Sequence, residues 1–327
     1  MADASILADE ARRSVKKATR NALGETLVEL FEEGIPVVAV DADLSGSTTL
    51  GKLASHSDEA AKRFFNAGIA EQNMVDVAAG LASIGNVAFT GSFAMFGIGR
   101  AYDQIRNTVC YSNLNVKLTP THSGISVGPD GGSHQMLEDI ALTRPLPNMR
   151  ILVPADYTSA KQMVRLAAEQ HGPFYIRLGR ENLPQVYSEA AEFEVGGSHV
   201  LREGADVAII ACGIEIDEAL KAAGILAGEG ISAEVIDAYS IKPLDEETIL
   251  RSVRKCGCAV TAEEHSVFGG LGEAVSHLLA ENAPAPVEMV GMRDKFGKSG
   301  SASELMRMFG LDASAIAEAA KKAVSRK

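Results

Sequence analysis

Residues 121–135, THSGISVGPDGGSHQ, form a glycine-rich segment that holds two of the seven histidines of the chain; we call it the histidine loop. Histidine changes charge near neutral pH, so His122 and His134 could transfer protons in a reaction. Asp130 lies between them, and the adjacent glycines allow the backbone to approach a ligand closely. Two histidines in one loop form a hydrogen-bonded structural pair about as often as they form a functional site. They could also bind a metal, but the sequence has no carboxylate–histidine spacing that favours one. Because polar loop residues at strand ends are often functional, the loop is a candidate acid–base site.

Glu71 belongs to a second candidate segment, RFFNAGIAEQNMVDVAAGLA, which covers residues 63–82. Apolar side chains follow it at the spacing of one helix face: Met74, Val77, Ala78 and Leu81. A carboxylate in the first turn of a helix is favoured by the helix dipole, so most glutamates at such a position are capping charges. A catalytic role for Glu71 therefore depends on the side chains that the fold brings next to it.

The elements that would position these residues are short apolar strands alternating with helices. Strands are expected at residues 37–40, 86–90, 116–119, 150–153, 174–178, 207–211, 233–237, 259–263 and 287–290. Helices are expected over residues 8–33, 71–82, 100–110 and 138–142, after Asp156, over 217–226, from 273 and as a C-terminal pair. This alternation predicts an α/β fold with two domains, each a mostly parallel sheet flanked by helices. An irregular stretch sets the expected domains at 1–187 and 203–327, with a linker at 188–202.

The composition restricts the classes of partner and compartment. The chain has 327 residues and a formal net charge of −12, which argues against non-specific binding to nucleic acid or acidic membranes. Four cysteines are too few for a disulfide scaffold at this length, and no apolar run approaches the roughly 18 residues of a membrane helix. The N-terminal residues lack the apolar centre of a signal peptide. We therefore expect a cytoplasmic, reduced protein.

Several motifs give the chain a resemblance to the C-terminal half of transketolase, in the same order from Ala18 onward. They are IAEQNM (69–74), GSFAMFGIGRAYDQIR (91–106), HSGISVGPDGGSHQ (122–135), RLGRENLP (177–184), DAYSIKPLD (237–245) and KFGKSGSASELMRMFGLDASAI (295–316). The resemblance implies a thiamine diphosphate pyrimidine-binding domain followed by a transketolase C-terminal domain. It also implies transfer of a two-carbon ketol unit from a ketose phosphate to an aldose phosphate.

The sequence lacks one motif of that family. Transketolases bind Mg²⁺ and the diphosphate of the cofactor through Gly-Asp-Gly followed by Asn, and Gly-Asp-Gly does not occur here. The resemblance therefore implies the C-terminal subunit of a split transketolase, which would be inactive alone. A separate N-terminal subunit would carry the diphosphate-binding domain and most of the Mg²⁺ ligands, no metal site is expected on this chain, and the expected assembly is α2β2.

For the cofactor, the resemblance implies roles for four residues. Glu71 matches the glutamate that hydrogen-bonds the pyrimidine ring, where a carboxyl group in a dry pocket can share a proton with a ring nitrogen. Phe93 and Phe96, which in isolation would more often be core residues, match the aromatic wall against that ring. Asp43 follows the strand at 37–40 and matches a residue near the cofactor at the subunit boundary.

For the sugar phosphates, the resemblance implies a second set of residues. His122 and His134 match substrate-site histidines that could transfer protons at sugar hydroxyls, and Asp130 matches a residue that contacts a hydroxyl. The residues that match phosphate sites are Arg20, Ser47 and Arg180, and arginine suits phosphate through its planar fork. Arg177 is a weaker candidate for the same role.

Some alternatives stay open. The family usually has glutamate where this chain has Pro129, so the sugar phosphate is not defined. The chain could instead resemble deoxyxylulose phosphate synthase, the β-chain of an oxoacid dehydrogenase, or a non-catalytic partner subunit. We interpret Glu263, Glu264 and His265, which close a predicted strand, as solvated or interface groups without a catalytic role. The C-terminal domain would then serve architecture and assembly.

Overall fold

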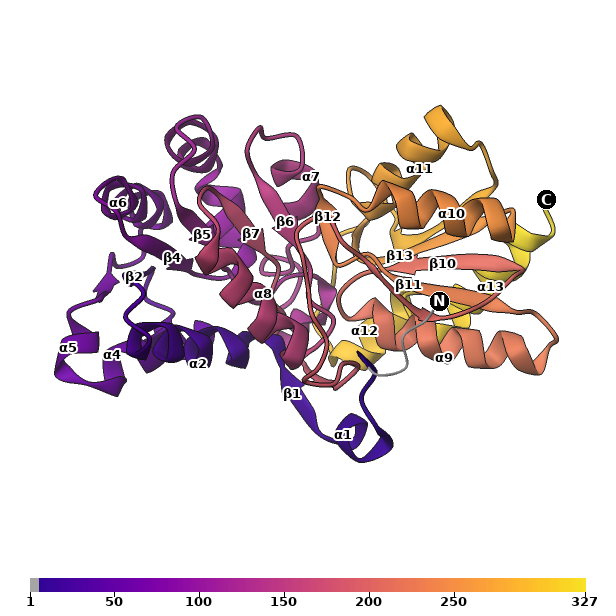
Figure 1. The fold of residues 1–327 in the computed structure, drawn as a ribbon, viewed down its shortest axis with the longest axis horizontal. Coiled ribbons are helices and arrows are strands. Elements are labelled where there is room, and N and C mark those ends of the chain that lie inside the picture. The colour runs from indigo at the N-terminus through magenta and orange to yellow at the C-terminus, as the bar shows by residue number, and fades with distance from the viewer. Residues whose placement is uncertain (1–5) are drawn as a thin grey trace.

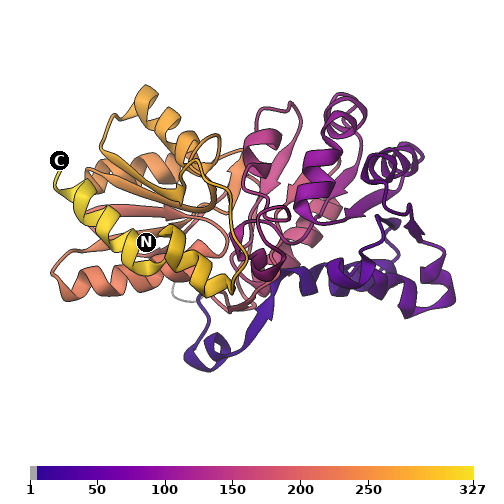
Figure 2. The same cartoon turned by 180° about the vertical axis from the view of Figure 1, so that it is seen from behind.

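The computed structural model of the protein describes residues 6–327 and contains two α/β units that lie side by side (Figure 1). The first unit is built around a seven-stranded sheet and the second around a five-stranded sheet. Helices cover both faces of each sheet, and the view from behind shows the two last helices lying across the second unit (Figure 2). The predicted fold class, two domains with mostly parallel sheets flanked by helices, is confirmed.

The seven-stranded sheet has the order β12-β6-β7-β5-β4-β2-β3, and β12 at one edge is its antiparallel strand. Its strands are β2 (Val37–Asp41), β3 (Phe64–Asn66), β4 (Val87–Gly91), β5 (Val116–Leu118), β6 (Arg150–Leu152), β7 (Phe174–Ile176) and β12 (Ser240–Lys242). α2 (Thr19–Glu32) and α8 (Tyr157–Glu169) pack on one face. α6 (Glu71–Ser83) and the π-helices η2 (Met95–Arg100) and η3 (Gln104–Cys110) pack on the other. Strands buried between two helical layers explain the continuous apolar runs in the sequence.

The five-stranded sheet has the order β14-β13-β10-β11-β9, and β9 is its antiparallel edge strand. Its strands are β9 (His199–Arg202), β10 (Val207–Ala211), β11 (Ala233–Asp237), β13 (Ala259–Ser266) and β14 (Val287–Met292). α9 (Glu215–Gly228) and α13 (Ala313–Val324) cover one face, and α10 (Glu246–Cys256) and α11 (Leu271–Asn282) cover the other. β9 lies in the expected linker, and β12 leaves the second unit to join the first sheet, so the two units share more than one connection.

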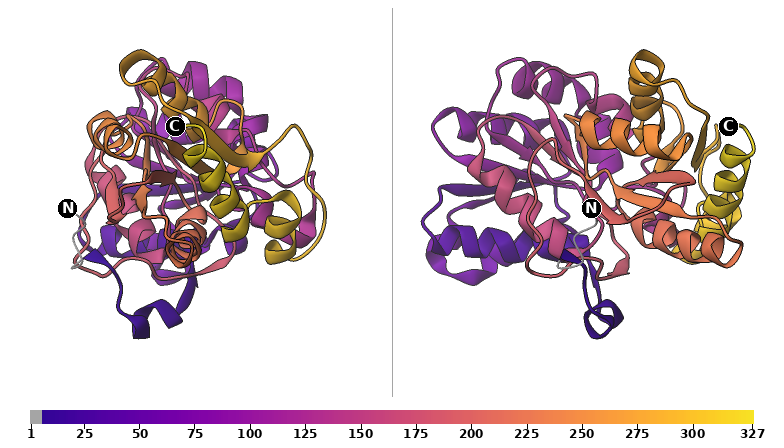
Figure 3. Two further views of the ribbon diagram at one scale, coloured as in Figure 1. Left: turned by 90° about the vertical axis from the view of Figure 1, so that its right-hand side faces the viewer. Right: turned by 45° about the vertical axis from the view of Figure 1, so that its right-hand side comes forward.

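The expectation of one helix over residues 8–33 is wrong. The chain forms α1 (Glu10–Ser14), then β1 (Lys16–Ala18), and only then α2. β1 pairs antiparallel with β8 (Asn182–Pro184), and this ribbon projects with α1 from the body of the molecule (Figure 3). Pairing with a distant strand therefore overrides the helical pattern, and it puts Arg20 in the first turn of α2.

Short elements occupy two segments that were expected to be loops. α3 (Ser45–Thr48), α4 (Gly51–His56) and α5 (Asp58–Ala61) follow β2, and the 3₁₀ turn η4 (Ile125–Asp130) lies inside the histidine loop. α7 (Asp139–Thr143) follows that loop, and α12 (Ala302–Phe309) packs against η4.

Within residues 6–327, no helix is long and apolar enough to cross a bilayer. The same residues contain no group of three or more His, Cys, Asp or Glu side chains arranged to hold a metal ion.

Candidate functional site

The candidate site lies at the C-terminal edge of the first sheet. Asp43 follows β2, Phe93 follows β4, His122 follows β5 and Arg180 follows β7. These strands are parallel, so the residues that follow them are brought to one edge of the sheet, where ligands bind in such folds. Arg20 contacts His122 from the first turn of α2.

The two histidines and the two phenylalanines form one aromatic cluster. The ring centroids of Phe93 and His122 are 3.8 Å apart with an angle of 24° between the rings, so these rings stack. Phe93 and Phe96 are also nearly parallel, at 6.2 Å. His134 meets Phe96 edge to face at 5.2 Å. The structure therefore brings together four side chains that the sequence analysis placed in two separate motifs.

His122 is buried and held in one orientation. Its Nδ1 lies 2.7 Å from the hydroxyl of Thr121, and its Nε2 lies 3.4 Å from Nη1 of Arg20. The backbone of His122 has a φ of 59°, a conformation that is uncommon for residues other than glycine and is found at functional sites. Burial, together with the charges of Arg20 and Arg180, lowers the pKa of His122 to about 3. The imidazole is therefore neutral at physiological pH and can accept or donate a hydrogen bond.

Arg20 and Arg180 form a cationic end of the site. Nη1 of Arg20 donates to the backbone carbonyl of Ser47 at 3.0 Å, and Nη1 of Arg180 donates to Val127 O at 3.0 Å and to Asp130 at 3.2 Å. Burial and the neighbouring charge of Arg180 lower the pKa of Arg20. Nε of Arg20 is buried and has no hydrogen-bond partner among the described residues. Two close cations and an unused buried donor favour binding of an anion such as phosphate.

Glu71 forms the opposite end of the cluster. Its carboxylate is 2% exposed and accepts from Nη1 of Arg100 at 2.7 Å, whereas the Arg100 side chain is 50% exposed. The guanidinium of Arg100 also lies 4.8 Å from the centroid of Phe96. Arg100 thus connects the buried carboxylate to the aromatic pair, so Glu71 makes an ion pair in addition to its favourable position at the start of α6.

Asp43 is not part of this contact network. It is exposed, has a φ of 64° and accepts from the side-chain amide of Asn66 at 3.2 Å. Within the described part of the chain, no hydrogen bond or ion pair connects it to Glu71 or the histidines. Asp41 is the buried carboxylate of this strand end, and burial raises its pKa to about 6. Its side chain accepts from the Leu44 amide at 2.6 Å and therefore shapes the turn before α3.

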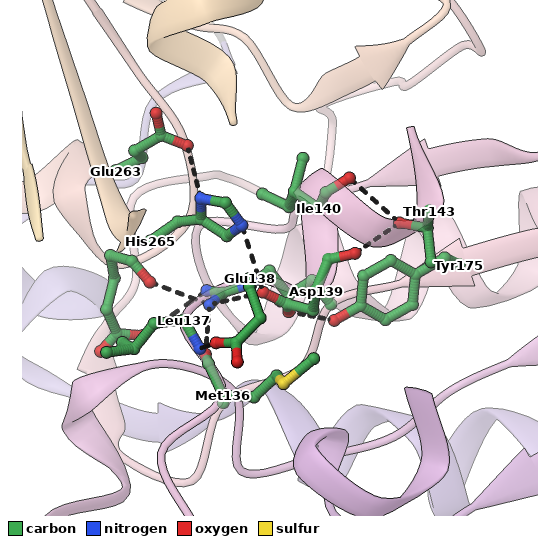
Figure 4. A network of polar contacts seen from close by, with 12 residues as sticks. Met136, Leu137, Glu138, Asp139, Ile140, Thr143, Tyr175, Glu263 and His265 are labelled. Carbon is green, nitrogen blue, oxygen red and sulfur yellow. Dashed lines mark hydrogen bonds and ion pairs between the residues drawn. The ribbon is translucent and has the colours of Figure 1, made fainter. Parts of the chain in front are cut away.

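Arg177 does not face the cationic end, so its expected role as a weaker phosphate ligand is wrong. Its side chain is buried, and its Nε donates to Asp139 at 2.7 Å. Burial opposes the charge, but the carboxylate of Asp139 outweighs it and raises the pKa of Arg177. Tyr175 also donates to Asp139, so Arg177 belongs to a buried hydrogen-bond network away from the cationic end (Figure 4).

Glu263, Glu264 and His265 are also buried, so their interpretation as solvated groups is wrong. Glu264 and His265 contact the first α/β unit, whereas Glu263 binds backbone amides of its own unit. Glu264 accepts from the amide of Ser126 in the histidine loop at 2.7 Å. His265 accepts at Nε2 from the amide of Ala141 in α7 at 3.3 Å, which favours the neutral tautomer with a proton on Nδ1. Figure 4 shows His265 between Glu263 of its own strand and Asp139 of the first unit.

Sequence reasoning missed three residues of this arrangement. Arg100 lies four positions after Phe96, a spacing that could have indicated contact with the aromatic pair. Thr121, which orients His122, has a hydroxyl beside the loop histidine but no motif of its own. Glu264 has no local signal, because its partner Ser126 is far away in the sequence and only the packing of the two units joins them.

Comparisons with known proteins identify the family of both units. Residues 15–186 match the family described as the transketolase pyrimidine binding domain, and residues 196–316 match the transketolase C-terminal domain. A solved structure described as split gene transketolase, inactive β4 tetramer, has 49% identity and a TM-score of 0.87, covering 95% of this chain and 99% of that chain.

Two curated relatives differ in length. A 6-deoxy-6-sulfo-D-fructose transketolase subunit of Clostridium sp. is 41% identical, covering 94% of this chain and 95% of that protein. Human transketolase is 36% identical over 95% of this chain but only 50% of the human protein, so this chain spans about half of a single-chain transketolase. The chain therefore belongs to the transketolase family and corresponds to the C-terminal subunit of a split transketolase.

Proposed function

We propose that this chain, together with an N-terminal subunit, is a thiamine diphosphate-dependent transketolase that transfers a two-carbon ketol unit from a ketose phosphate to an aldose phosphate. The observation that carries the proposal is the single cluster that joins a buried carboxylate, an aromatic wall, two histidines and two arginines. Each group has the chemistry that such a transfer requires, and together they extend from a cofactor end to a phosphate end.

The cofactor end suits the aminopyrimidine of thiamine diphosphate. Glu71 presents a buried carboxylate that can share a proton with a ring nitrogen, and Phe93 and Phe96 offer nearly parallel aromatic faces against which a flat ring can stack. Arg100 now occupies the space between Glu71 and Phe96 and would share the carboxylate with the ring. When bound, the cofactor supplies the nucleophilic carbon and electron sink for cleavage of a bond next to a carbonyl.

The substrate end suits a phosphorylated sugar. Arg20 and Arg180 would bind phosphate, and the unused Nε of Arg20 gives it a donor that no residue of the described chain occupies. His122 is neutral at pH 7, so it would act as a hydrogen-bond partner for a sugar hydroxyl. It could also pass a proton on, although the imidazole carries no charge in its resting state. His134, at the open side of the cluster, would take the second position at the sugar.

Three observations support dependence on a partner subunit. It has no Gly-Asp-Gly motif, so the diphosphate and most of the Mg²⁺ ligands would come from an N-terminal subunit in an α2β2 assembly. Phe65 and Ile69, close before Glu71, are 38% and 78% exposed, and apolar side chains beside a cofactor end suit a subunit contact. The related split-gene structure is itself described as an inactive β4 tetramer.

The sugar itself is not fixed by the site. Pro129 lies exposed in the histidine loop, where the family usually has a carboxylate, so one polar contact to substrate would be absent. Relatives of similar length act, by their names, on 6-deoxy-6-sulfo-D-fructose and on apulose-4-phosphate. Screening should therefore include ketoses with different anionic groups as well as the common ketose phosphates.

The test is an assay of ketol transfer with thiamine diphosphate and Mg²⁺. It compares this chain alone, this chain mixed with its candidate N-terminal partner, and the same mixture with Glu71→Ala. We expect activity only in the unaltered mixture. Activity from this chain alone would contradict the shared cofactor site. Tight cofactor binding by a mixture that transfers no ketol unit from any donor would contradict the reaction, and no cofactor binding would indicate a non-catalytic subunit.

A further inference from the structure

Glu263 and Glu264 are consecutive on β13 but serve different parts of the molecule. Glu263 accepts from the amides of Leu271 and Gly272 at 2.7 and 2.8 Å, so it caps the start of α11 within the second unit. Glu264 accepts from the amide of Ser126 at 2.7 Å, in the first unit. Successive side chains of a strand point to opposite faces, which explains why neighbouring carboxylates have such different partners.

The carboxylate of Glu264 is held in place by Arg177. Nη1 of Arg177 lies 3.6 Å from Oε1 of Glu264, and Nη2 donates to the backbone carbonyl of Glu264 at 2.9 Å. Arg177 is fixed in turn by Asp139. The same carboxylate accepts from the hydroxyl of Tyr175 (Figure 4). One oxygen of Glu264 therefore faces a fixed cation while the other accepts from the histidine loop.

The loop is shaped to admit this carboxylate. Gly124 has a φ of 77°, and a Cβ atom there would lie 2.0 Å from Oε1 of Glu264, so no other residue fits without displacing it. A second hydrogen bond between the units lies nearby, because Nε2 of Gln135 donates to Lys298 O of the second unit at 2.9 Å. The same nitrogen donates to Ile125 O within the loop at 3.1 Å. Both units thus enclose the segment between His122 and His134.

We propose that Glu264 is a positioning residue, through which the C-terminal domain fixes the histidine loop in the geometry that binds substrate. Ser126 lies between the two histidines, and its amide would lose its acceptor without this carboxylate. The C-terminal domain then contributes to substrate affinity and turnover, in addition to architecture. The consequence for kinetics rests on the proposed function, whereas the consequence for loop order does not.

Glu264→Gln is the informative substitution. A carboxylate offers acceptor oxygens to both Ser126 and Arg177, whereas an amide has one acceptor and presents donors on its other side. Because the cation of Arg177 attracts the amide oxygen, we expect the variant to turn its NH2 group toward the N–H of Ser126. The histidine loop then loses its acceptor while the size of the side chain is kept. Glu263→Gln is the matched control, because it also removes one of two accepted bonds, from the adjacent residue, without touching the loop.

Two measurements test the proposal. Hydrogen exchange followed by mass spectrometry on the full chain should show amides of residues 124–135 exchanging about tenfold faster in Glu264→Gln and within twofold of wild type in Glu263→Gln. In the complex with the N-terminal subunit, Glu264→Gln should lower kcat/KM for the sugar phosphate about tenfold while the half-saturating concentration of thiamine diphosphate changes less than twofold.

Each outcome decides the question. Unchanged loop exchange in Glu264→Gln, or equal acceleration in both variants, would overturn the positioning role. So would faster exchange with unaltered kcat/KM in an active complex. If the wild-type complex transfers no ketol unit, the proposed function fails on its own, and the exchange data still decide whether Glu264 orders the loop.

Discussion

The two ends of the candidate site are built in different ways. The end at Glu71 uses side chains of the first unit only, and its ion pair reaches water through Arg100, which is half exposed. The end at the histidine loop is enclosed from two sides, because Glu264 and the Gln135–Lys298 bond bring the second unit against it. Arg177, which pairs with Asp139 and Glu264 behind the loop, is almost completely buried.

This difference suits two ends with different tasks. An end that must complete a cofactor site with another subunit needs accessible groups, and its side chains can rearrange when that subunit binds. An end that recognises a small, phosphorylated substrate needs fixed donors, since preorganised groups lose less entropy on binding. Under the proposed function, the chain would therefore leave its cofactor end open and fix its substrate end by internal packing.

The largest expected effect is at the open end. Glu71→Gln should lower kcat of the reconstituted enzyme by about 100- to 10,000-fold, because an amide cannot exchange a proton with the pyrimidine ring. KM for the sugar phosphate should change little, since that site lies at the other end. Steady-state kinetics measure both values. Asp76→Asn, an exposed carboxylate on the same helix, is the control. A mainly raised KM would contradict the separation of the two ends.

The two ion pairs should differ in their effect on stability. Arg177→Met leaves the buried Asp139 without its cation and should lower the free energy of unfolding by about 3–5 kcal/mol. Arg100→Met removes a half-exposed partner and should lower it by about 1 kcal/mol, because water screens that pair. Urea unfolding of the two variants measures the difference. Equal losses of free energy of unfolding in the two variants would mean that the ion pair at Glu71 is as tightly packed as the ion pair at Asp139.

The cationic end should affect only phosphorylated substrates. Arg180→Ala should raise KM for a ketose phosphate about 10- to 100-fold, the range expected for losing a hydrogen bond to a charged group. A ketose without phosphate should be used equally by variant and wild type. Arg165→Ala, a surface arginine paired with Glu29 and Glu33, is the matched control. Equal losses with both classes of sugar would argue against a phosphate ligand.

The smallest expected effect is a pH dependence of stability from His122. Its pKa is about 3 in the folded chain and about 6.5 when unfolded, so the unfolded chain binds the extra proton between these values. Stability should therefore fall with decreasing pH, by about 2 kcal/mol at pH 5 for this residue. His122→Gln should remove that part of the pH dependence.

The check for His122 is urea unfolding at pH 8 and at pH 5. The difference between the two pH values should shrink in His122→Gln but not in His277→Gln, which alters an exposed histidine on α11. An unchanged difference in His122→Gln would mean that this imidazole gains its proton in the folded chain, and that the closed end is wetter than its packing indicates.

Much of the fold follows from local patterns in the sequence. The buried strand β10 is apolar throughout and β2 is apolar up to its last residue, Asp41, so the sequence predicts the positions of both within one residue. The helix expected over residues 8–33 failed because nothing in Lys16–Ala18 forbids a helix, and only the distant strand β8 makes it extended. Tertiary pairing of this kind has no local signature.

The site could be predicted as a set of residues but not as a geometry. Motifs indicated Glu71, the phenylalanines and the histidines, yet they could not show that Arg100 pairs with the carboxylate. Arg177 and Arg180 are three positions apart in one motif, and only the fold shows that one is buried against Asp139 while the other faces the loop. The assigned roles, including that of the exposed Asp43, remain predictions for the kinetic tests.

The tight fit of the histidine loop has a consequence for recombination between relatives. Cβ atoms at Gly131 and Gly132 would lie 2.6 Å from the Ser299 hydroxyl and 2.9 Å from Gly297 O, so the loop and residues 297–300 are shaped to each other. A chimera that exchanges the C-terminal domain alone would pair the loop with a segment that was not shaped to it. Libraries that shuffle such subunits should therefore inherit the loop and residues 297–300 from one parent.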